Sequence, residues 1–258
     1  MKKILIRDWR GHGGSYSPFF PYERFVMAQE KIVRKRLEGI VAHDTLIITT
    51  HPPTITLGAR SLKEQLSHIK PLPTRMKEST DPDDALLEKA ASYLWRGHRI
   101  NLVKTNRGGS VWYHDHGVLQ LYLIAETEPF AAAIIYPLEE VLLRALADLG
   151  VAATRANEHI RQKNKSFLGI WARGKKIAAL GMRIQRHATR FVSMFGASLN
   201  VKSCKANSAL IDPCGIPDCQ MTSVANELND DYRVSHSMLL PIVYEHIQDV
   251  FGITCINL

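Results

Sequence analysis

Ile211-Asp212-Pro213-Cys214-Gly215-Ile216 places a thiol between a proline and a glycine. Proline lacks a backbone N–H and glycine tolerates unusual dihedral angles, so this stretch suits neither a helix interior nor a central strand. A second stretch, Arg173-Gly174-Lys175-Lys176-Ile177-Ala178-Ala179-Leu180-Gly181, predicts a basic turn that leads into an apolar strand. We expect the first stretch to form a tight turn that presents Cys214, and we expect the fold to bring Lys176 to it.

The composition is that of a globular protein with a hydrophobic core. The chain has 258 residues, of which 45% are apolar and 22% charged. It shows no internal repeat, and no apolar run approaches the roughly 18 residues that a membrane span needs. The apolar run after Met1-Lys2-Lys3 is too short for a signal peptide and predicts a first strand. We expect a cytoplasmic protein that forms a single domain over residues 1–258.

Helical and extended patterns follow one another without regular alternation. Apolar residues recur at helical spacing over 22–38, and Asp81-Pro82-Asp83-Asp84 has an acceptor, a proline and acids in the order of a helix start. Tyr136-Pro137 predicts another helix start, and a last helix is expected over about 238–251, whereas 61–80 is expected to be a loop. This mixture predicts an α+β fold with a mixed or antiparallel sheet packed with helices. Strands are expected at 44–50, 54–57, 98–104, 118–125, 167–171, 177–184, 189–195 and 198–201.

Three features are candidates for chemistry. A lone cysteine is most often a small buried hydrophobe, but an ammonium near the Cys214 turn would favour the thiolate. Lys175 and Lys176 point to opposite faces of a strand, so at most one of them can point into a pocket. Arg107-Gly108-Gly109 begins an aromatic-rich segment that ends at His114, and its glycines would let a ligand approach the backbone closely. Taken alone, that segment is also compatible with an ordinary hairpin turn.

Several other site classes have little support. Cys204, Cys214 and Cys219 lack the close pairing of zinc ligands, and His114 and His116 would be only a weak metal pair, so no metal is expected. Free thiols are favoured over disulfides. The phosphate-binding loops of common nucleotide enzymes are absent. The net charge of +8 is scattered, so we expect no nucleic-acid partner, although a docking surface for an acidic protein is compatible with it.

Taken together and in order, the motifs resemble those of the lipoyl(octanoyl) transferase family. The resemblance extends from about Tyr22 to Val224. It rests on His51-Pro52-Pro53-Thr54-Ile55-Thr56-Leu57-Gly58, Arg107-Gly108-Gly109 through Tyr113-His114, Lys176-Ile177-Ala178-Ala179-Leu180-Gly181, 196–201 with Leu199-Asn200, and Pro213-Cys214-Gly215 followed by Met221-Thr222-Ser223.

The resemblance implies the fold of biotin and lipoate protein ligases. It also implies an enzyme that moves an octanoyl or lipoyl group from acyl carrier protein to a lysine of lipoyl domains, without a cofactor. The acceptors would be the lipoyl domains of 2-oxoacid dehydrogenase complexes and the glycine cleavage H protein. Cys214 would carry the acyl group as a thioester, and Lys176 would favour its thiolate. The acyl pocket would be lined by Arg107, Gly108, Gly109, Ser110, Val111, Trp112, Tyr113, His114, Ala179, Leu180, Gly181, Gly196, Ala197 and Ser198.

The sequence also departs from the family pattern. Asp115-His116 replaces the usual Gly-Pro after His114, Phe195 replaces a histidine, and Ser110 and Trp112 stand where glutamine and threonine are commoner. These changes fall in the expected pocket wall and bear on acyl-chain length, and the stretch 63–81 is longer than usual. Two alternatives are an ATP-dependent lipoate or biotin ligase, in which Cys214 is incidental, and an idle relative that only binds an acyl chain or carrier protein.

Overall fold

The structure is a computed structural model, and it describes residues 2–10, 21–155, 168–202 and 209–257. Its described residues form an eight-stranded sheet in the order β11-β1-β2-β6-β10-β9-β8-β7. Strand β1 runs parallel to both of its neighbours, whereas the remaining pairs are antiparallel. The sheet is therefore mixed, as the sequence predicts. Its strands are β1 (Lys2–Asp8), β2 (Asp44–Thr49), β6 (Val118–Ile124), β7 (Ala153–Arg155), β8 (Ile170–Ala172), β9 (Lys175–His187), β10 (Arg190–Asn200) and β11 (Ile253–Asn257).

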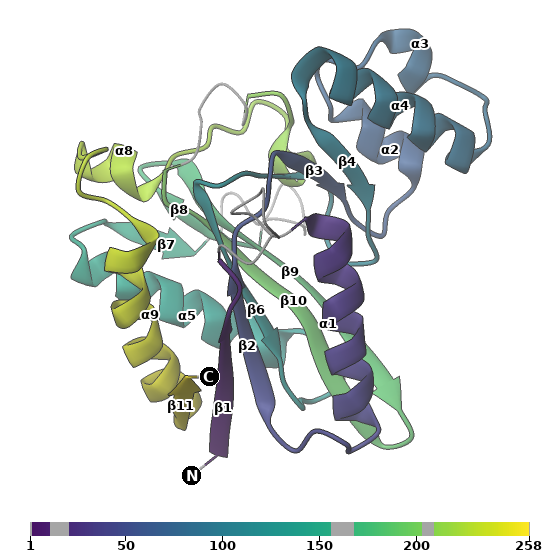
Figure 1. The fold of residues 1–258 in the computed structure, drawn as a ribbon. Helices are drawn as coiled ribbons and strands as arrows, with labels where there is room; N and C mark the ends of the chain where they lie inside the picture. The colour runs from purple at the N-terminus through teal and green to yellow at the C-terminus, as the bar shows by residue number, and fades with distance from the viewer. Residues whose placement is uncertain (1, 11–20, 156–167, 203–208, 258) are drawn as a thin grey trace.

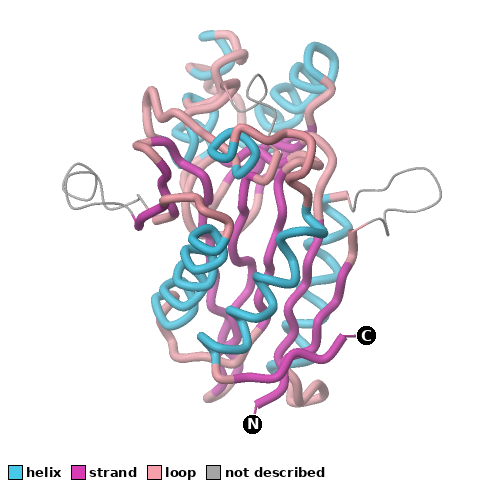
Figure 2. The backbone as a smooth tube through the Cα atoms, turned by 90° about the vertical axis from the view of Figure 1, so that its left-hand side faces the viewer, coloured by secondary structure: helices cyan, strands magenta, loops and turns pink. Residues whose placement is uncertain are grey.

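Helices cover both faces of this sheet (Figure 1). Helix α1 (Tyr22–Leu37) packs Phe25 and Val33 against β6 and β10 on one face. On the other face lie α5 (Ala132–Asp148) and α9 (His236–Phe251), which pass across the strands in Figure 2. Each fully buried aliphatic or aromatic side chain in these interfaces contributes about 1.5–3 kcal/mol of burial free energy. This packing makes the large sheet a rigid support.

A second, smaller sheet has its own core. Strands β3 (Thr54–Leu57), β4 (Asn101–Lys104) and β5 (Trp112–His114) pair in the order β4-β3-β5. Helices α2 (Leu62–Ser67), α3 (Thr74–Lys77) and α4 (Asp83–His98) lie together beside it (Figure 1). The 3₁₀ turn η1 (Pro213–Gly215) contacts β5, so the Cys214 turn is attached to this smaller sheet. A short helix, α8 (Val224–Leu228), follows the turn.

Two of the predicted elements are wrong in kind or position. The stretch 61–80 is not a loop, because Ser61 accepts a hydrogen bond from the Glu64 backbone and so caps α2, and Pro73 directly precedes α3. Helix α5 begins at Ala132 rather than at Tyr136-Pro137. A proline this near a helix start removes only one internal hydrogen bond, and the apolar residues before it form the first turn.

Other predicted boundaries shift by a few residues. Helix α4 continues to His98, so β4 begins only at Asn101, and Arg99 between them is left-handed, with φ of 55°. The strands expected at 189–195 and 198–201 are one strand, β10, in which Phe195 has φ of 73°. The start of the strand expected at 167–171 lies outside the described residues, and β8 begins at Ile170. The short elements β7, α8 and β11 were not predicted.

Candidate active site

The Cys214 thiol is presented by a constrained turn. Cys214 has φ of 60° and ψ of 17°, in the left-handed region that costs a residue with a Cβ of order 1 kcal/mol or more. Its backbone N–H donates to the carbonyl of Val111 at 2.9 Å, and the N–H of Gly215 donates to Asp212 O at 2.9 Å. The turn is therefore held from both sides in a conformation that the chain would not adopt unaided.

Lys176 reaches the thiol from the start of β9. Its side chain is fully buried, whereas that of Lys175 is exposed on the other strand face. The Nζ of Lys176 lies 3.1 Å from Cys214 Sγ and donates to Leu168 O at 3.0 Å. The backbone of Lys176 is fixed as well, because its N–H donates to Gln220 O at 2.8 Å and its carbonyl accepts from Thr222 N at 2.9 Å.

Two indole rings and a glycine shape the space around the ammonium. Nζ lies 5.4 Å from the ring centre of Trp171 and 6.0 Å from that of Trp112, within the range of cation–π attraction. A Cβ on Gly169 would lie 2.9 Å from Lys176 Cε, so only glycine leaves room for the lysine stem. Among the described residues, the ammonium contacts a carbonyl, a thiol and two indole faces but no carboxylate.

Cys214 lines a cavity of about 290 Å³ between the two sheets. The loop that carries Arg107 and Gly108 covers β9, because the N–H of Gly108 donates to Met182 O at 3.0 Å. A Cβ on Gly181 would lie 3.2 Å from Gly108 O, so the small residue permits this close approach. The residues expected in the pocket that do line it are Arg107, Gly108, Gly109, Ser110, Trp112, His114, Ala179, Leu180, Gly181, Gly196 and Ser198.

Three expected pocket residues do not line the cavity. Val111 and Tyr113 alternate with the lining residues of their segment and are buried in the core of the smaller sheet. Ala197 lies between Gly196 and Ser198 and is buried in the core of the large sheet. The fully buried Lys176 also does not line the cavity wall and reaches the site through its contact with Cys214.

Seven lining residues were not expected. Tyr122 and Met182 lie on strands that the sequence did predict, so strand alternation offered a signal for them. The others come from elements whose position in space the sequence does not show. The full set is Tyr22, Arg60, Tyr122, Ala131, Ile135, Leu168 and Met182. Phe195, which was expected in the pocket wall as a departure from the family pattern, lines the cavity as well.

A hydrogen-bonded wall lies along one part of the cavity. Arg107 Nη2 donates to the carbonyl and the hydroxyl oxygen of Thr56 at 3.0 and 2.8 Å, and that hydroxyl lies 3.0 Å from His114 Nε2. Tyr122 Oη donates to Gln120 Oε1 at 3.2 Å, and Ser198 Oγ donates to the same oxygen. We refer to His114, Tyr122, Gln120, Ser198, Thr56 and Arg107 as the polar wall.

Burial keeps His114 and Tyr122 of the polar wall neutral. Desolvation, together with the neighbouring His51 and Arg107, holds the pKa of His114 well below its usual value of 6.5. Desolvation, with Tyr22 adjacent, raises the pKa of Tyr122 well above its usual value of 10.0. At neutral pH the wall therefore presents an uncharged imidazole and an uncharged phenol to the cavity.

The remaining cysteines differ from Cys214. Cys214, Cys219 and Cys255 are free thiols, and Cys204 lies outside the described residues. Burial raises the pKa of the Cys219 thiol to about 11, so it stays protonated near neutral pH. In the described part of the chain, no group of three histidine, cysteine or acidic residues is arranged to hold a metal ion. The helices described there are also too short or too polar to cross a membrane.

Comparison with known proteins identifies the family. Residues 21–247 match the lipoyl protein ligase A/B catalytic domain family. The chain belongs to this family. It is 31% identical to an octanoyltransferase of Alkaliphilus metalliredigens over 90% of this chain and 91% of that protein. It is 34% identical to an octanoyltransferase of Chloroflexus aggregans over 78% of this chain and 77% of that protein. The family resemblance inferred from the motifs is thus confirmed.

Solved structures of this family share the fold. Lipoate-protein ligase A bound with ATP superposes with a TM-score of 0.68 at 16% identity, over 99% of this chain and 87% of that one. A bipartite lipoate protein ligase from Thermoplasma acidophilum, studied with its E2 lipoyl domain, gives 0.65 at 15% identity, over 99% and 86%. At this identity the likeness confirms the predicted ligase-like fold and carries no statement about the reaction.

Proposed function

We propose that this enzyme transfers an octanoyl group from a carrier-protein thioester to a lysine of a lipoyl domain through a thioester on Cys214. The observation that carries the proposal is the 3.1 Å contact between Lys176 Nζ and Cys214 Sγ beside the cavity that Cys214 lines. A thiolate next to a buried ammonium is the reactive form of a nucleophilic cysteine. The membership in a family that includes octanoyltransferases supports this reaction.

In the first half-reaction the thiolate of Cys214 attacks the carbonyl carbon of the donor thioester. The bond between that carbon and the donor sulfur breaks, and the donor leaves as a thiolate. The ammonium of Lys176 supplies the proton that converts this leaving group to a thiol. The acyl group remains a thioester throughout, so the exchange needs no ATP, and Lys176 is left as a neutral amine.

In the second half-reaction the neutral amine of the acceptor lysine attacks the acyl carbon on Cys214. The carbon–sulfur bond breaks, the amide forms, and Cys214 returns to the thiolate. Lys176 takes the proton that the attacking nitrogen loses, which restores the original ion pair. The two steps return the enzyme to its starting state.

The oxyanion formed in each step requires donors from side chains. The backbone N–H groups of Cys214, Gly215 and Ile216 already donate to carbonyls within or beside the turn. The hydroxyl of Ser110, by contrast, is buried, lines the cavity with Cys214, and has no hydrogen-bond partner among the described residues. We assign Ser110 and Lys176 as the donors to this oxyanion.

The acyl chain would occupy the cavity between the Arg107–Gly109 loop and strands β9 and β10. Leu180, Met182 and Ile135 provide apolar contacts, and the paired glycines Gly181 and Gly196 also line the cavity. The polar wall would close the cavity and set the chain length that fits.

The proposed macromolecular substrates are octanoyl-acyl carrier protein as donor and, as acceptors, the lipoyl domains of 2-oxoacid dehydrogenases and of the glycine cleavage H protein. Such domains are commonly acidic. A surface groove between α1 and β9 is lined by Arg34, Arg183 and Arg186 together with Glu30 and Glu38, and its excess of basic over acidic side chains suits an acidic partner. Arg36 is not part of this surface, because it is buried in ion pairs with Asp44 and Glu126. We place the reaction in the cytoplasm, where free thiols persist.

One experiment tests the proposal against an ATP-dependent ligase. The protein is incubated with octanoyl-carrier protein in the absence of ATP, and its intact mass is measured before and after hydroxylamine treatment. We expect one octanoyl adduct that hydroxylamine removes and that Cys214→Ser does not form as a thioester. An adduct that persists as a thioester in Cys214→Ser would contradict the nucleophile assignment. A requirement for ATP in labelling a lipoyl domain would identify a ligase, and no turnover at all would identify an idle binding protein.

A further inference from the structure

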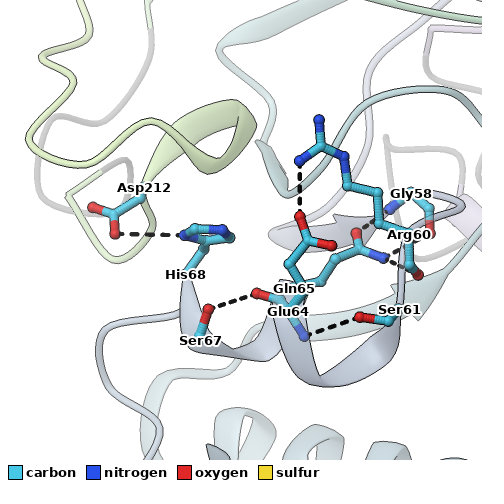
Figure 3. A network of polar contacts seen from close by, with 8 residues as sticks. All are labelled: Gly58, Arg60, Ser61, Glu64, Gln65, Ser67, His68 and Asp212. Atoms are coloured by element: carbon cyan, nitrogen blue, oxygen red, sulfur yellow. Dashed lines mark hydrogen bonds and ion pairs between the residues drawn. The ribbon is translucent and has the colours of Figure 1, made fainter. Parts of the chain in front are cut away.

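A histidine and an aspartate that the mechanism above does not use lie directly beside the Cys214 turn. His68 ends helix α2, and Asp212 is two residues before Cys214 (Figure 3). The Nδ1 of His68 lies 3.8 Å from Asp212 Oδ2, and the backbone N–H of Asp212 donates to His68 O at 2.8 Å. The two residues are thus connected through both their side chains and their backbones.

Helix α2 is anchored so that the position of His68 is defined. Gln65 bonds both backbone groups of Gly58, where β3 ends, and donates to Arg60 O at 2.8 Å (Figure 3). Gly58 is in turn pressed against the Gly108-Gly109 segment, since a Cβ there would lie 2.1 Å from Gly109 O. His68 is therefore tied to the loop that covers the acyl cavity.

With Nδ1 facing Asp212, the other ring nitrogen faces the nucleophile turn. A Cβ on Gly215 would lie 3.1 Å from His68 Nε2 and 3.3 Å from Ser110 Oγ. The imidazole and the Ser110 hydroxyl therefore approach the same side of the residue that follows Cys214. The side chain of His68 is 19% exposed and so keeps contact with solvent.

The proposed octanoyl transfer does not account for one of the two protons that the acceptor lysine loses. The inference below rests on that proposed function. A lysine side chain has a pKa near 10.4, so the acceptor arrives as an ammonium at neutral pH. It must lose one proton before it can attack and a second when the amide forms. Lys176 can take only one of these two protons, because it gave up a single proton to the donor thiol during loading.

We propose that His68, oriented by Asp212, accepts the first proton from the acceptor ammonium and releases it to water. The nitrogen–hydrogen bond of the ammonium breaks, its electron pair stays on the acceptor nitrogen, and the proton binds Nε2 of the neutral imidazole. The free amine then attacks the acyl-Cys214 carbon while Lys176 takes the second proton. His68 thus serves the transfer step and has no part in loading the enzyme.

The charged groups around His68 are compatible with this task. The carboxylate of Asp212 faces Nδ1, while Lys70 lies 3.3 Å from the other oxygen of that carboxylate. Glu64 on the same helix is engaged by Arg60. The Cys214–Lys176 pair lies across Gly215 and has no net charge before loading.

The test measures the two half-reactions separately in His68→Gln, with His98→Gln, an exposed histidine at the end of α4, as the matched control. Loading is followed by intact mass with octanoyl-carrier protein. Transfer is followed in a single turnover of purified octanoyl-enzyme with a lipoyl domain, from pH 6.5 to 9. We expect loading to be unchanged and transfer at pH 7 to fall about 10²-fold. The deficit should shrink as pH rises, because the acceptor ammonium then ionises unaided.

Asp212→Asn provides a second variant, for which we expect a smaller, about 10-fold loss confined to transfer. A loss that is equal in loading and transfer, or one that does not vary with pH, would show that His68 only supports the turn and would overturn the inference. Failure of the wild-type enzyme to form a hydroxylamine-sensitive adduct would instead overturn the proposed function, so the two failures are distinguishable.

Discussion

The polar groups in the two parts of the cavity differ in how fully they are hydrogen-bonded within the protein. Beside Cys214, Ser110 Oγ and Trp112 Nε1 are buried without a hydrogen-bond partner among the described residues. Along the polar wall most polar atoms are paired, because Gln120 accepts from Tyr122 and Ser198 and Thr56 links Arg107 to His114, although His114 Nδ1 is buried without a partner among the described residues. An unpartnered buried donor costs about 1–3 kcal/mol, which a fold accepts where a substrate atom completes the bond.

This difference separates chemistry from shape. The groups near Cys214 remain available to the charges that appear during acyl transfer, so substitutions there should change rates. Most groups of the polar wall are hydrogen-bonded to one another, so substitutions there should change stability before they change chemistry. Substitutions near Cys214 and near the polar wall test this distinction.

The largest effect is expected at the cysteine end, from Lys176→Ala. Removing the ammonium takes away both the partner of the thiolate and the group that moves a proton in each step, so octanoyl transfer should fall about 10²–10⁴-fold. Single-turnover loading and transfer assays measure it. The exposed neighbour Lys175→Ala is the matched control and should retain wild-type rates.

Alkylation of Cys214 provides a second comparison between the wild-type protein and Lys176→Ala. At neutral pH the wild-type thiol should react with iodoacetamide faster than that of Lys176→Ala, since the thiolate is the reactive form. Equal alkylation rates at every pH would show that the 3.1 Å contact does not activate the thiol. That result would contradict the view that the groups near Cys214 determine the reaction rate.

The next effect is expected on the wall side, from Gly196→Ala. A Cβ there would lie 2.0 Å from the backbone oxygen of Leu121, so strands β6 and β10 must separate. We expect the free energy of unfolding in urea to fall by about 2–4 kcal/mol. Gly97→Ala is the control, because a Cβ at this helix position meets nothing within 4 Å and should stabilise by up to about 1 kcal/mol. Equal stability of the two variants would mean that strands β6 and β10 separate at Gly196 without a measurable cost in stability.

The elements that the sequence predicted are those with a strong local pattern. Helix α1 was placed to within one residue because its apolar residues recur at helical spacing. Strands β2, β3 and β6 were placed to within one residue because they are short runs rich in β-branched and apolar residues. The stretch 61–80 was misassigned because its helices are shorter than two turns and its two prolines, Pro71 and Pro73, lie between them. Local propensity does not reveal such helices, since their stability comes from packing on the smaller sheet.

Site residues that follow a local sequence pattern were likewise predicted, and those brought in by distant elements were not. The alternation of Lys175 and Lys176 predicted that one lysine alone could reach a pocket, and the structure has the Lys176 side chain buried at the thiol. Tyr22, Ala131 and His68 could not be predicted, because each is brought to the site by an element distant in sequence. Phe195 was expected in the pocket wall from its departure from the family pattern, but its left-handed backbone follows only from the fold.

The smallest expected effect is the pH dependence of stability that the polar wall imposes through His114. Its pKa is held well below 6.5 in the folded state, chiefly by desolvation, whereas in the unfolded chain it returns to about 6.5. Between these values the unfolded state binds the extra proton. Stability from this group is therefore complete above about pH 6.5 and is lost as the pH falls toward the folded-state pKa.

The loss should amount to at most about 1.4 kcal/mol per pH unit for each such histidine. His236, whose pKa burial lowers to about 4, contributes a similar slope between pH 6.5 and 4. Urea unfolding at several values between pH 7 and 5 avoids most carboxylate titration and measures the sum. His114→Asn and His236→Asn should each remove about half of the slope, whatever they do to the stability at pH 7. An unchanged slope in His114→Asn would mean that His114 protonates freely in the folded protein, and the wall would then be open to water rather than closed by its own hydrogen bonds.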